Sequence, residues 1–255
     1  MIELLHLVKR FGDLVAVNDL SLTVKKGEFF AVLGPNAAGK TTTIRILTGL
    51  IKPSSGTARV AGYDVQTQPL EVRRRMAYVP DFPFLYDKLT PSEFLRFTGQ
   101  MFRMDDGPIR TNAAALVSRF NLEQYMNKAI EGLSHGTRQR VAIVSALLHD
   151  PEVFVIDEPM VGLDPHHARV VKDVLKERSL AGMTVFVSTH QLSVAEEMAD
   201  RIGIIHQGRL IAVGTRDELR HQSGAAGALE QTFLALTAQE ANGAEDRKVA
   251  AGAGK

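Results

Sequence analysis

The residues with the most recognisable chemistry form a glycine-rich stretch that ends in a lysine and a threonine. Residues 34–41 read GPNAAGKT and match the pattern G-x-x-x-x-G-K-[ST], directly after the apolar run 29–33. Such a loop curls so that backbone N–H groups, a lysine and the next helix N-terminus all face a bound polyphosphate. The alternative is a glycine-rich turn with an incidental lysine. The candidate phosphate-binding residues are Gly34, Pro35, Asn36, Ala37, Ala38, Gly39, Lys40, Thr41 and Thr42.

Two adjacent acids and a histidine form a second candidate group. Asp157 and Glu158 follow an apolar run, and ligands bind at the carboxyl ends of strands in open α/β sheets. We expect Asp157 to bind Mg²⁺ together with Thr41, and Glu158 to accept a proton from an attacking water or to orient that water. His190 also ends an apolar run and is a candidate for a hydrogen bond to the terminal phosphate. Considered alone, the two acids are consistent with a solvated loop, and the histidine is consistent with a structural role. Their expected position in one shared site instead favours catalysis.

A sheet is needed to bring these groups together. Short, continuous apolar runs precede each group and predict strands buried on both faces of a parallel sheet. The alternating Leu20, Leu22 and Val24 instead predict antiparallel strands near the N-terminus. Helical spacing dominates residues 91–149, inside the strand-forming sequence. The predicted fold class is therefore α/β, with a central and mainly parallel sheet, an N-terminal antiparallel β part and an inserted helical part.

Composition and charge exclude several classes of protein. With 30 Lys+Arg and 29 Asp+Glu in 255 residues, the formal net charge is +1, so bulk charge gives no attraction to nucleic acid or anionic lipid. The lack of cysteine excludes disulfide frameworks and thiolate metal sites and fits a reducing compartment. No apolar stretch approaches the roughly 20 residues of a spanning helix, and the N-terminus reads as a strand rather than an export signal.

A further segment indicates a family. Residues 133–140 read LSHGTRQR and resemble the signature of the ATP-binding-cassette (ABC) family, usually Leu-Ser-Gly-Gly-Gln followed by a basic residue, Gln and Arg. The resemblance covers about residues 3–215. It implies a P-loop NTPase (RecA-like) core, ATP and Mg²⁺ as cofactors, and ATP hydrolysis with His190 as the switch histidine. It also implies roles for Phe11 stacking on adenine, Asp81 at the glutamine-loop position near Mg²⁺, Ser134 and Gly136 binding the ATP of a second copy, and Asp164 in the D-loop.

The chain departs from the family pattern in three places. Ala37 stands where glycine is common; it is harmless if the backbone there needs no positive φ and strains the loop otherwise, and we expect it to be tolerated. His135 and Thr137 replace Gly and Gln in the signature, so contacts specific to that Gln do not carry over. Asp81 replaces Gln with a shorter, charged group that can bind Mg²⁺ or water but lacks an amide donor.

The resemblance implies the ATP-hydrolysing subunit of an ABC transporter. The strand-and-turn sequence 208–215, the late segment 229–234 and the acid at position 81 resemble single-cassette ATPases of ABC-2-type bacterial exporters. That implies an ATP-dependent, head-to-tail dimer on the cytoplasmic face of a membrane. Its partner is an integral membrane permease gripped by the helical insert, and no nucleic acid is expected. The alternative is a soluble ABC ATPase that acts on nucleic acid or ribosomes.

The resemblance also predicts how the chain divides into structural parts. We expect residues 1–236 to form one nucleotide-binding domain, in which 1–82 and 151–215 make the α/β core with its β part. Residues 83–150 are the helical insert with the signature, and 216–236 a C-terminal helical segment broken at Gly224 to Gly227. Residues 237–255 lack periodicity and are expected to be a disordered tail.

Overall fold

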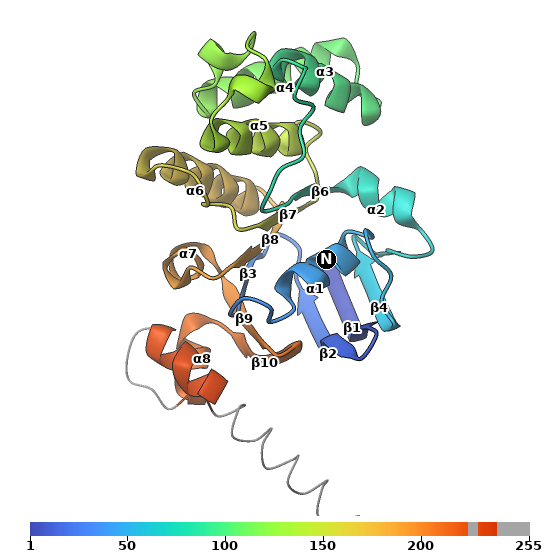
Figure 1. Ribbon diagram of the computed structural model, residues 1–255, viewed down its shortest axis with the longest axis vertical. Helices are drawn as coiled ribbons and strands as arrows, with labels where there is room; N and C mark the ends of the chain where they lie inside the picture. The colour runs from blue at the N-terminus through green and yellow to red at the C-terminus, as the bar shows by residue number, and fades with distance from the viewer. Residues whose placement is uncertain (224–228, 239–255) are drawn as a thin grey trace, which may run out of the picture.

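The computed structural model describes residues 1–223 and 229–238, which form an α/β fold built on two sheets (Figure 1). The larger sheet has the order β10-β9-β3-β8-β7-β6, and its neighbours are parallel except in the β9–β10 hairpin. Strands β3, β7 and β8 are buried along their whole length, which explains their continuous apolar sequence. The predicted fold class is confirmed. These strands are β3 (Phe29–Leu33), β6 (Met76–Val79), β7 (Val153–Asp157), β8 (Thr184–Thr189), β9 (Arg201–His206) and β10 (Arg209–Gly214).

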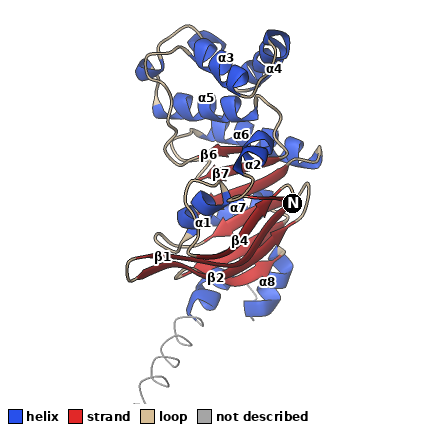
Figure 2. Cartoon of the chain, turned by 90° about the vertical axis from the view of Figure 1, so that its right-hand side faces the viewer, coloured by secondary structure: helices blue, strands red, loops and turns tan. Residues whose placement is uncertain are grey.

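A four-stranded antiparallel sheet, in the order β2-β1-β4-β5, contains the N-terminal strands (Figure 2). Its core-facing residues in β2 include Leu20, Leu22 and Val24, as their alternation predicts. Strands β4 and β5 escaped the sequence analysis because β4 buries only Ala58 and Val60, too few apolar residues for a recognisable pattern. The strands are β1 (Ile2–Phe11), β2 (Leu14–Val24), β4 (Ser55–Val60) and β5 (Tyr63–Asp64).

Successive residues of the central strands face two different cores. Phe30 of β3 packs with Ile44 of α1 in the core shared with the antiparallel sheet. Phe29 packs in the opposite core, together with Val171 and Leu175 of α6. Covering both faces of the sheet is what requires strands that are apolar at every position. The helices around the two sheets are α1 (Lys40–Leu47), α2 (Pro69–Arg75), α6 (Pro165–Leu180) and α7 (Leu192–Met198).

The inserted segment forms a layer of helices at the end of the molecule away from the antiparallel sheet (Figure 1). Helix α3 begins with a capping box, in which the Thr90 hydroxyl accepts from Glu93 N while the Glu93 carboxylate accepts from Thr90 N. Phe120 and Ile130 are fully buried and continue the core that α6 covers. The elements are α3 (Pro91–Met101), α4 (Asp106–Arg119), α5 (His135–Leu147) and the 3₁₀ turns Glu123–Tyr125 and Ile130–Gly132.

The C-terminal part contributes α8 (Arg216–Ser223) and a last helix over residues 229–238. The predicted break at Gly224 to Gly227 lies outside the described residues. The described part of this helix reaches residue 238, two residues past the predicted end at 236; Thr237 Oγ1 donates to Phe233 O at 2.8 Å and Leu236 is buried. The rest of the segment predicted to be a tail, 239–255, lies outside the description. Among residues 1–223 and 229–238, no helix combines the length and apolarity needed to span a bilayer.

Candidate functional site

The glycine-rich loop connects β3 to α1, the order that confirms its motif. Gly39 caps α1 with a φ of 106°, and a Cβ there would lie 2.5 Å from Ala16 O in β2. A Cβ at Gly34 would lie 2.4 Å from Ile205 O in β9. Both glycines are therefore required, because strands from the two sheets approach the loop backbone closely.

Ala37 has a φ of 62°, so the position does need the left-handed backbone and the loop carries strain. The structure therefore shows the strained alternative at Ala37, and the tolerance of the loop for this strain stays a prediction. Ala37→Gly removes about 1–2 kcal/mol of strain and adds about 0.4–1 kcal/mol of backbone entropy loss on folding. We expect a net gain of about 0.5–1 kcal/mol in the free energy of unfolding, measurable by urea denaturation. Ala113→Gly, inside α4, is the matched control and should be destabilising; an Ala37→Gly variant that loses stability would contradict the strain.

The Lys40 side chain is enclosed by the loop and only 7% exposed. Its Nζ donates to Gly34 O at 2.7 Å and to Pro35 O at 3.1 Å. Burial lowers the pKa of the Lys40 ammonium group, whereas the carboxylates of Glu158 and Asp157 raise it. Lysine therefore lies close enough to both acids for charge coupling, which places the loop and the acidic strand end in one site.

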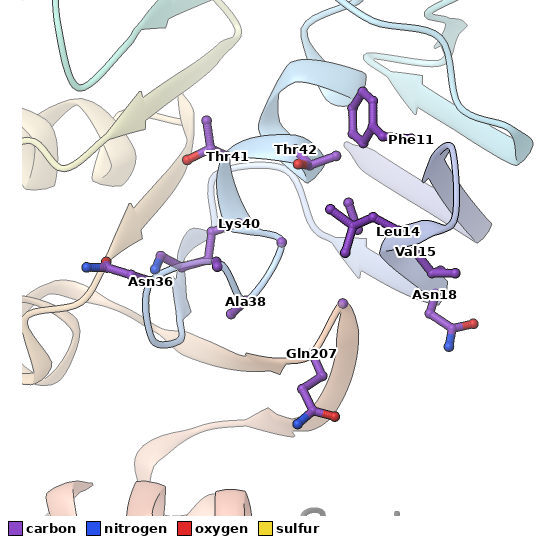
Figure 3. Close-up of a pocket in the computed structure, with 14 residues that line it drawn as sticks. Phe11, Leu14, Val15, Asn18, Asn36, Ala38, Lys40, Thr41, Thr42 and Gln207 are labelled. Carbon is purple, nitrogen blue, oxygen red and sulfur yellow. The ribbon is translucent and has the colours of Figure 1, made fainter.

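A pocket of about 640 Å³ extends from the loop to the β1–β2 hairpin (Figure 3). Figure 3 shows Lys40 and Thr41 on one side of it and Phe11 and Leu14 on another. The half-exposed Phe11 ring offers a surface for stacking. Seven of the nine predicted loop residues line this pocket; Gly34 and Pro35 instead present their carbonyls to Lys40. The lining residues from the predicted set are Phe11, Asn36, Ala37, Ala38, Gly39, Lys40, Thr41 and Thr42.

Part of this pocket escaped the sequence analysis. The β9–β10 turn reaches the loop, where Gly208 N donates to Ala38 O at 2.8 Å and Asn18 N donates to Gly208 O at 2.8 Å. The turn itself was predicted, but nothing in the local sequence places it beside a loop some 170 residues earlier. Residues 14–16 follow Phe11 in the β1–β2 hairpin. Their closeness to Phe11 in the sequence was the only signal that could have identified them. The missed lining residues are Leu14, Val15, Ala16, Asn18, Gln207 and Gly208.

The candidate metal ligands lie at the junction of α1 and β7. Thr41 Oγ1 donates to Asp157 Oδ2 at 3.0 Å, so the two side chains predicted to act together are adjacent. Burial raises the pKa of the Asp157 carboxyl, the Thr41 hydrogen bond lowers it, and the carboxylates of Asp81 and Glu158 raise it further. Asp81 is exposed, and its carboxylate accepts from Phe82 N at 2.9 Å. It is thus electrostatically coupled to Asp157 without a hydrogen bond to it.

Glu158 and His190 form one hydrogen-bonded unit. The Glu158 Oε1 atom accepts from His190 N at 3.0 Å and lies 2.7 Å from His190 Nδ1. The other oxygen, Oε2, accepts from Thr189 Oγ1 at 3.2 Å. Glu158 has a φ of 48°, a left-handed backbone that turns its side chain toward β8 rather than along β7. The carboxylate is therefore oriented by the end of the neighbouring strand.

The signature and D-loop residues lie together but do not line the pocket. Ser134 caps α5 and its hydroxyl accepts from Thr137 N at 3.3 Å. A Cβ at Gly136 would lie 2.5 Å from Gly162 O, so the signature packs directly on the loop before Asp164. The Asp164 carboxylate accepts from His167 N at 2.9 Å, which lowers the pKa of Asp164. One chain therefore keeps its signature apart from its own loop.

His135, one of the departures, occupies the space that a family glycine would leave. Its ring lies 5.5 Å from the Phe82 ring, centroid to centroid. A Cβ on Gly162 would lie 2.1 Å from His135 Cδ2, so the ring also rests on the Gly162 backbone. The histidine thus contacts both the segment after Asp81 and the segment before Asp164.

The fold, together with the arrangement of the glycine-rich loop, the two acids and the histidine, defines an ATPase of the P-loop class. The family description "ABC transporter" matches residues 17–161. The chain belongs to this family and is an ATP-binding and ATP-hydrolysing subunit of an ABC transporter.

Relatives of known name agree with this assignment. The chain is 35% identical over 242 residues to the linearmycin resistance ATP-binding protein LnrL of Bacillus subtilis, covering 95% of this chain and 76% of the relative. It is 36% identical over 219 residues to the Nod factor export ATP-binding protein I of Cupriavidus pinatubonensis, covering 86% and 67%.

Solved structures share the fold. The ATP-binding subunit of an ABC transporter superposes with a TM-score of 0.89 at 33% identity, covering 93% of this chain and 99% of that one. A dimeric ATP-binding cassette in a post-hydrolysis state, bound to ADP and Pi, superposes with a TM-score of 0.77 at 27% identity, covering 84% and 98%.

Proposed function

We propose that this chain drives an ABC-2-type export complex, with two copies bound to a separate integral membrane permease at the cytoplasmic face of a membrane. The observation that supports the proposal is the separation of two candidate phosphate-binding surfaces on one chain: the loop at Lys40, and the capped N-terminus of α5 at Ser134, outside that pocket. Each surface needs a partner copy to complete a site. The names of relatives that include export and resistance support the direction of transport.

In the proposed reaction, a water oxygen bonds to the γ-phosphorus of ATP, the bond to the β–γ bridging oxygen breaks, and ADP and phosphate leave. Glu158 accepts the proton of that water at its carboxylate. His190 and Thr189 orient the carboxylate through the contacts described above. Lys40 and the loop N–H groups bind the phosphates, and Phe11 stacks on adenine.

The donor set fits Mg²⁺. A threonine hydroxyl and a carboxylate, Thr41 and Asp157, are adjacent, and Asp81 adds negative charge nearby. Among the described residues no group of three or more His, Cys, Asp and Glu side chains forms a cage for a metal. Mg²⁺ suits such a site because it commonly binds one or two carboxylates together with substrate phosphates and waters. When bound, it would neutralise charge that develops on the phosphate oxygens.

The second copy contributes the other half of each site in this proposal. Ser134 and Gly136 sit where backbone N–H groups of α5 have no partner within the helix, so they can bind the γ-phosphate held by the partner copy. Asp164 lies on the loop that packs against Gly136 and is placed to contact that copy. ATP bound from both sides favours the closed pair, and loss of the γ-phosphate removes that preference.

The permease is proposed to bind a groove beside the helical layer. The groove has a volume of about 240 Å³ and is lined by residues of β6, α3 and α5, including Val79, Phe94 and Ala142. Phe84, at its edge, is 92% exposed, and the neighbouring Phe82 is 69% exposed. Large exposed aromatics next to a groove suit an amphipathic helix that buries its apolar face. The groove also adjoins Asp81, which links permease contact to the hydrolysis site.

Phe84→Asp is expected to weaken permease binding by at least tenfold, because burying one phenylalanine contributes about 1.5–3 kcal/mol. The measurement is the amount of integral membrane protein that co-purifies from detergent extracts of the native host, identified by mass spectrometry. Leu180→Asp, at a site 79% exposed at the end of α6, is the control and should retain the partner. Absence of any integral membrane partner for the unmodified chain would refute the transporter assignment; equal retention by Phe84→Asp would remove the groove from it.

A further inference from the structure

The last helix, residues 229–238, shares a small core with α7 and α8 beside the six-stranded sheet. Leu229 is fully buried and Leu236 nearly so. They join a small core with Ala195 of α7 and with Leu33, the last residue of β3 before the glycine-rich loop. Its buried members differ from those of the two cores described above. Its remaining members are Ala31, Ile202, Ile204, Ala212 and Leu219, with Leu192, Ala199, Ile211 and Phe233 packed around them.

A hydrogen bond joins this helix to α7. Glu196 Oε1, on α7, accepts from Leu229 N at 3.1 Å. Glu196 therefore ties α7 to the last helix at a defined point.

Helix α7 begins two residues after His190. Gln191 N donates to Thr189 Oγ1 at 3.0 Å, and that hydroxyl in turn donates to Glu158. The helix has only seven residues, so its own hydrogen bonds do not hold it in place and its position depends on neighbours. On the side of α6, Lys172 pairs with Glu197, and Lys176 Nζ donates to Met198 O at 3.2 Å. Strands β3 and β8 also contact α7, and the last helix meets it at Glu196.

We propose that the last helix, held through Glu196, sets the position of the segment that carries His190, so that Glu196 is a positioning residue for ATP hydrolysis. It touches neither the reacting atoms nor the pocket and acts through α7 on the Glu158–His190 pair. The inference rests on the proposed catalytic roles of those two residues. It gives the C-terminal part of the chain a task in turnover that is separate from nucleotide binding, because the loop at Lys40 lies outside this core.

The test compares steady-state hydrolysis of MgATP by full-length variants. Glu196→Ala is expected to lower kcat about tenfold, the scale of a displaced catalytic group, with the KM for ATP unchanged within twofold. Glu196→Gln keeps an oxygen that accepts from Leu229 N and should recover most of the rate. Glu230→Ala, at an exposed acid on the last helix, is the control and should match the kcat of the parent.

A double-mutant comparison separates positioning from general loss of stability. In a His190→Ala background, Glu196→Ala should cause no further fall in kcat, because the group it positions is gone. An equal fall in both backgrounds, a kcat for Glu196→Ala within twofold of the parent, or a parallel loss of ATP affinity measured by calorimetry would each overturn the inference. A parent chain that does not hydrolyse ATP would instead overturn the proposed function itself.

Discussion

Glu158→Gln lowers the rate of ATP hydrolysis by about 10²–10⁴-fold in our expectation, the range that general bases contribute. The glutamine keeps an oxygen that can accept from His190 N, so the segment around β8 should stay in place. What is lost is the group that takes the proton from water. Nucleotide affinity should change little, because the loop around Lys40 makes the phosphate contacts. Steady-state phosphate release and calorimetry with MgATP measure the two quantities separately.

The same variant should accumulate pairs of chains in MgATP, because the nucleotide that joins them is not consumed. Light scattering should then report a doubled mass that returns to that of a single chain in MgADP. Glu3→Gln, an exposed position on β1, is the control and should hydrolyse ATP at the parent rate. Turnover within threefold of the parent for Glu158→Gln would exclude Glu158 as the base. A chain that stays single, even with solubilised permease, would exclude the shared site.

Lys40→Ala should raise the dissociation constant for ATP by about 100-fold. Hydrogen bonds from a charged donor contribute about 1.5–3 kcal/mol, and the Lys40 side chain is oriented by its enclosure in the loop. Its loss also leaves Gly34 O and Pro35 O without their donor, so the loop itself becomes less well held. Calorimetric titration with MgATP gives the affinity, and thermal denaturation of the same samples shows whether the fold is retained.

Lys26→Ala is the matched control, since Lys26 is exposed and carries the same charge outside the pocket. Its affinity for ATP should equal that of the parent. If Lys40→Ala binds ATP as tightly as Lys26→Ala while both melt near the parent temperature, the loop is not the phosphate site. If Lys40→Ala melts far below the parent, the main role of Lys40 is to hold the loop. Lys40→Arg, which keeps the charge, then tests whether the affinity for ATP depends on that charge.

Several features followed directly from the sequence because chain connectivity alone fixes them. The loop at Lys40 is one continuous segment between a buried strand and a helix, so its residue spacing determines how its N–H groups converge. The apolar runs of β3, β7 and β8 identify strands covered on both faces. The Ser134 cap and the helix after it are likewise local. Weakly patterned elements such as β4, which buries two apolar residues, were not recognised.

Contacts between distant segments were decided only by the tertiary structure. Glu158 meets His190 because β7 and β8 are neighbours and because residue 158 adopts a positive φ that no local pattern reveals. The positive φ of Ala37 is likewise not revealed by any local pattern. The last helix meets α7 in a core assembled from several elements. Sequence spacing sets what neighbouring residues can do, whereas burial of apolar surface decides which remote residues meet.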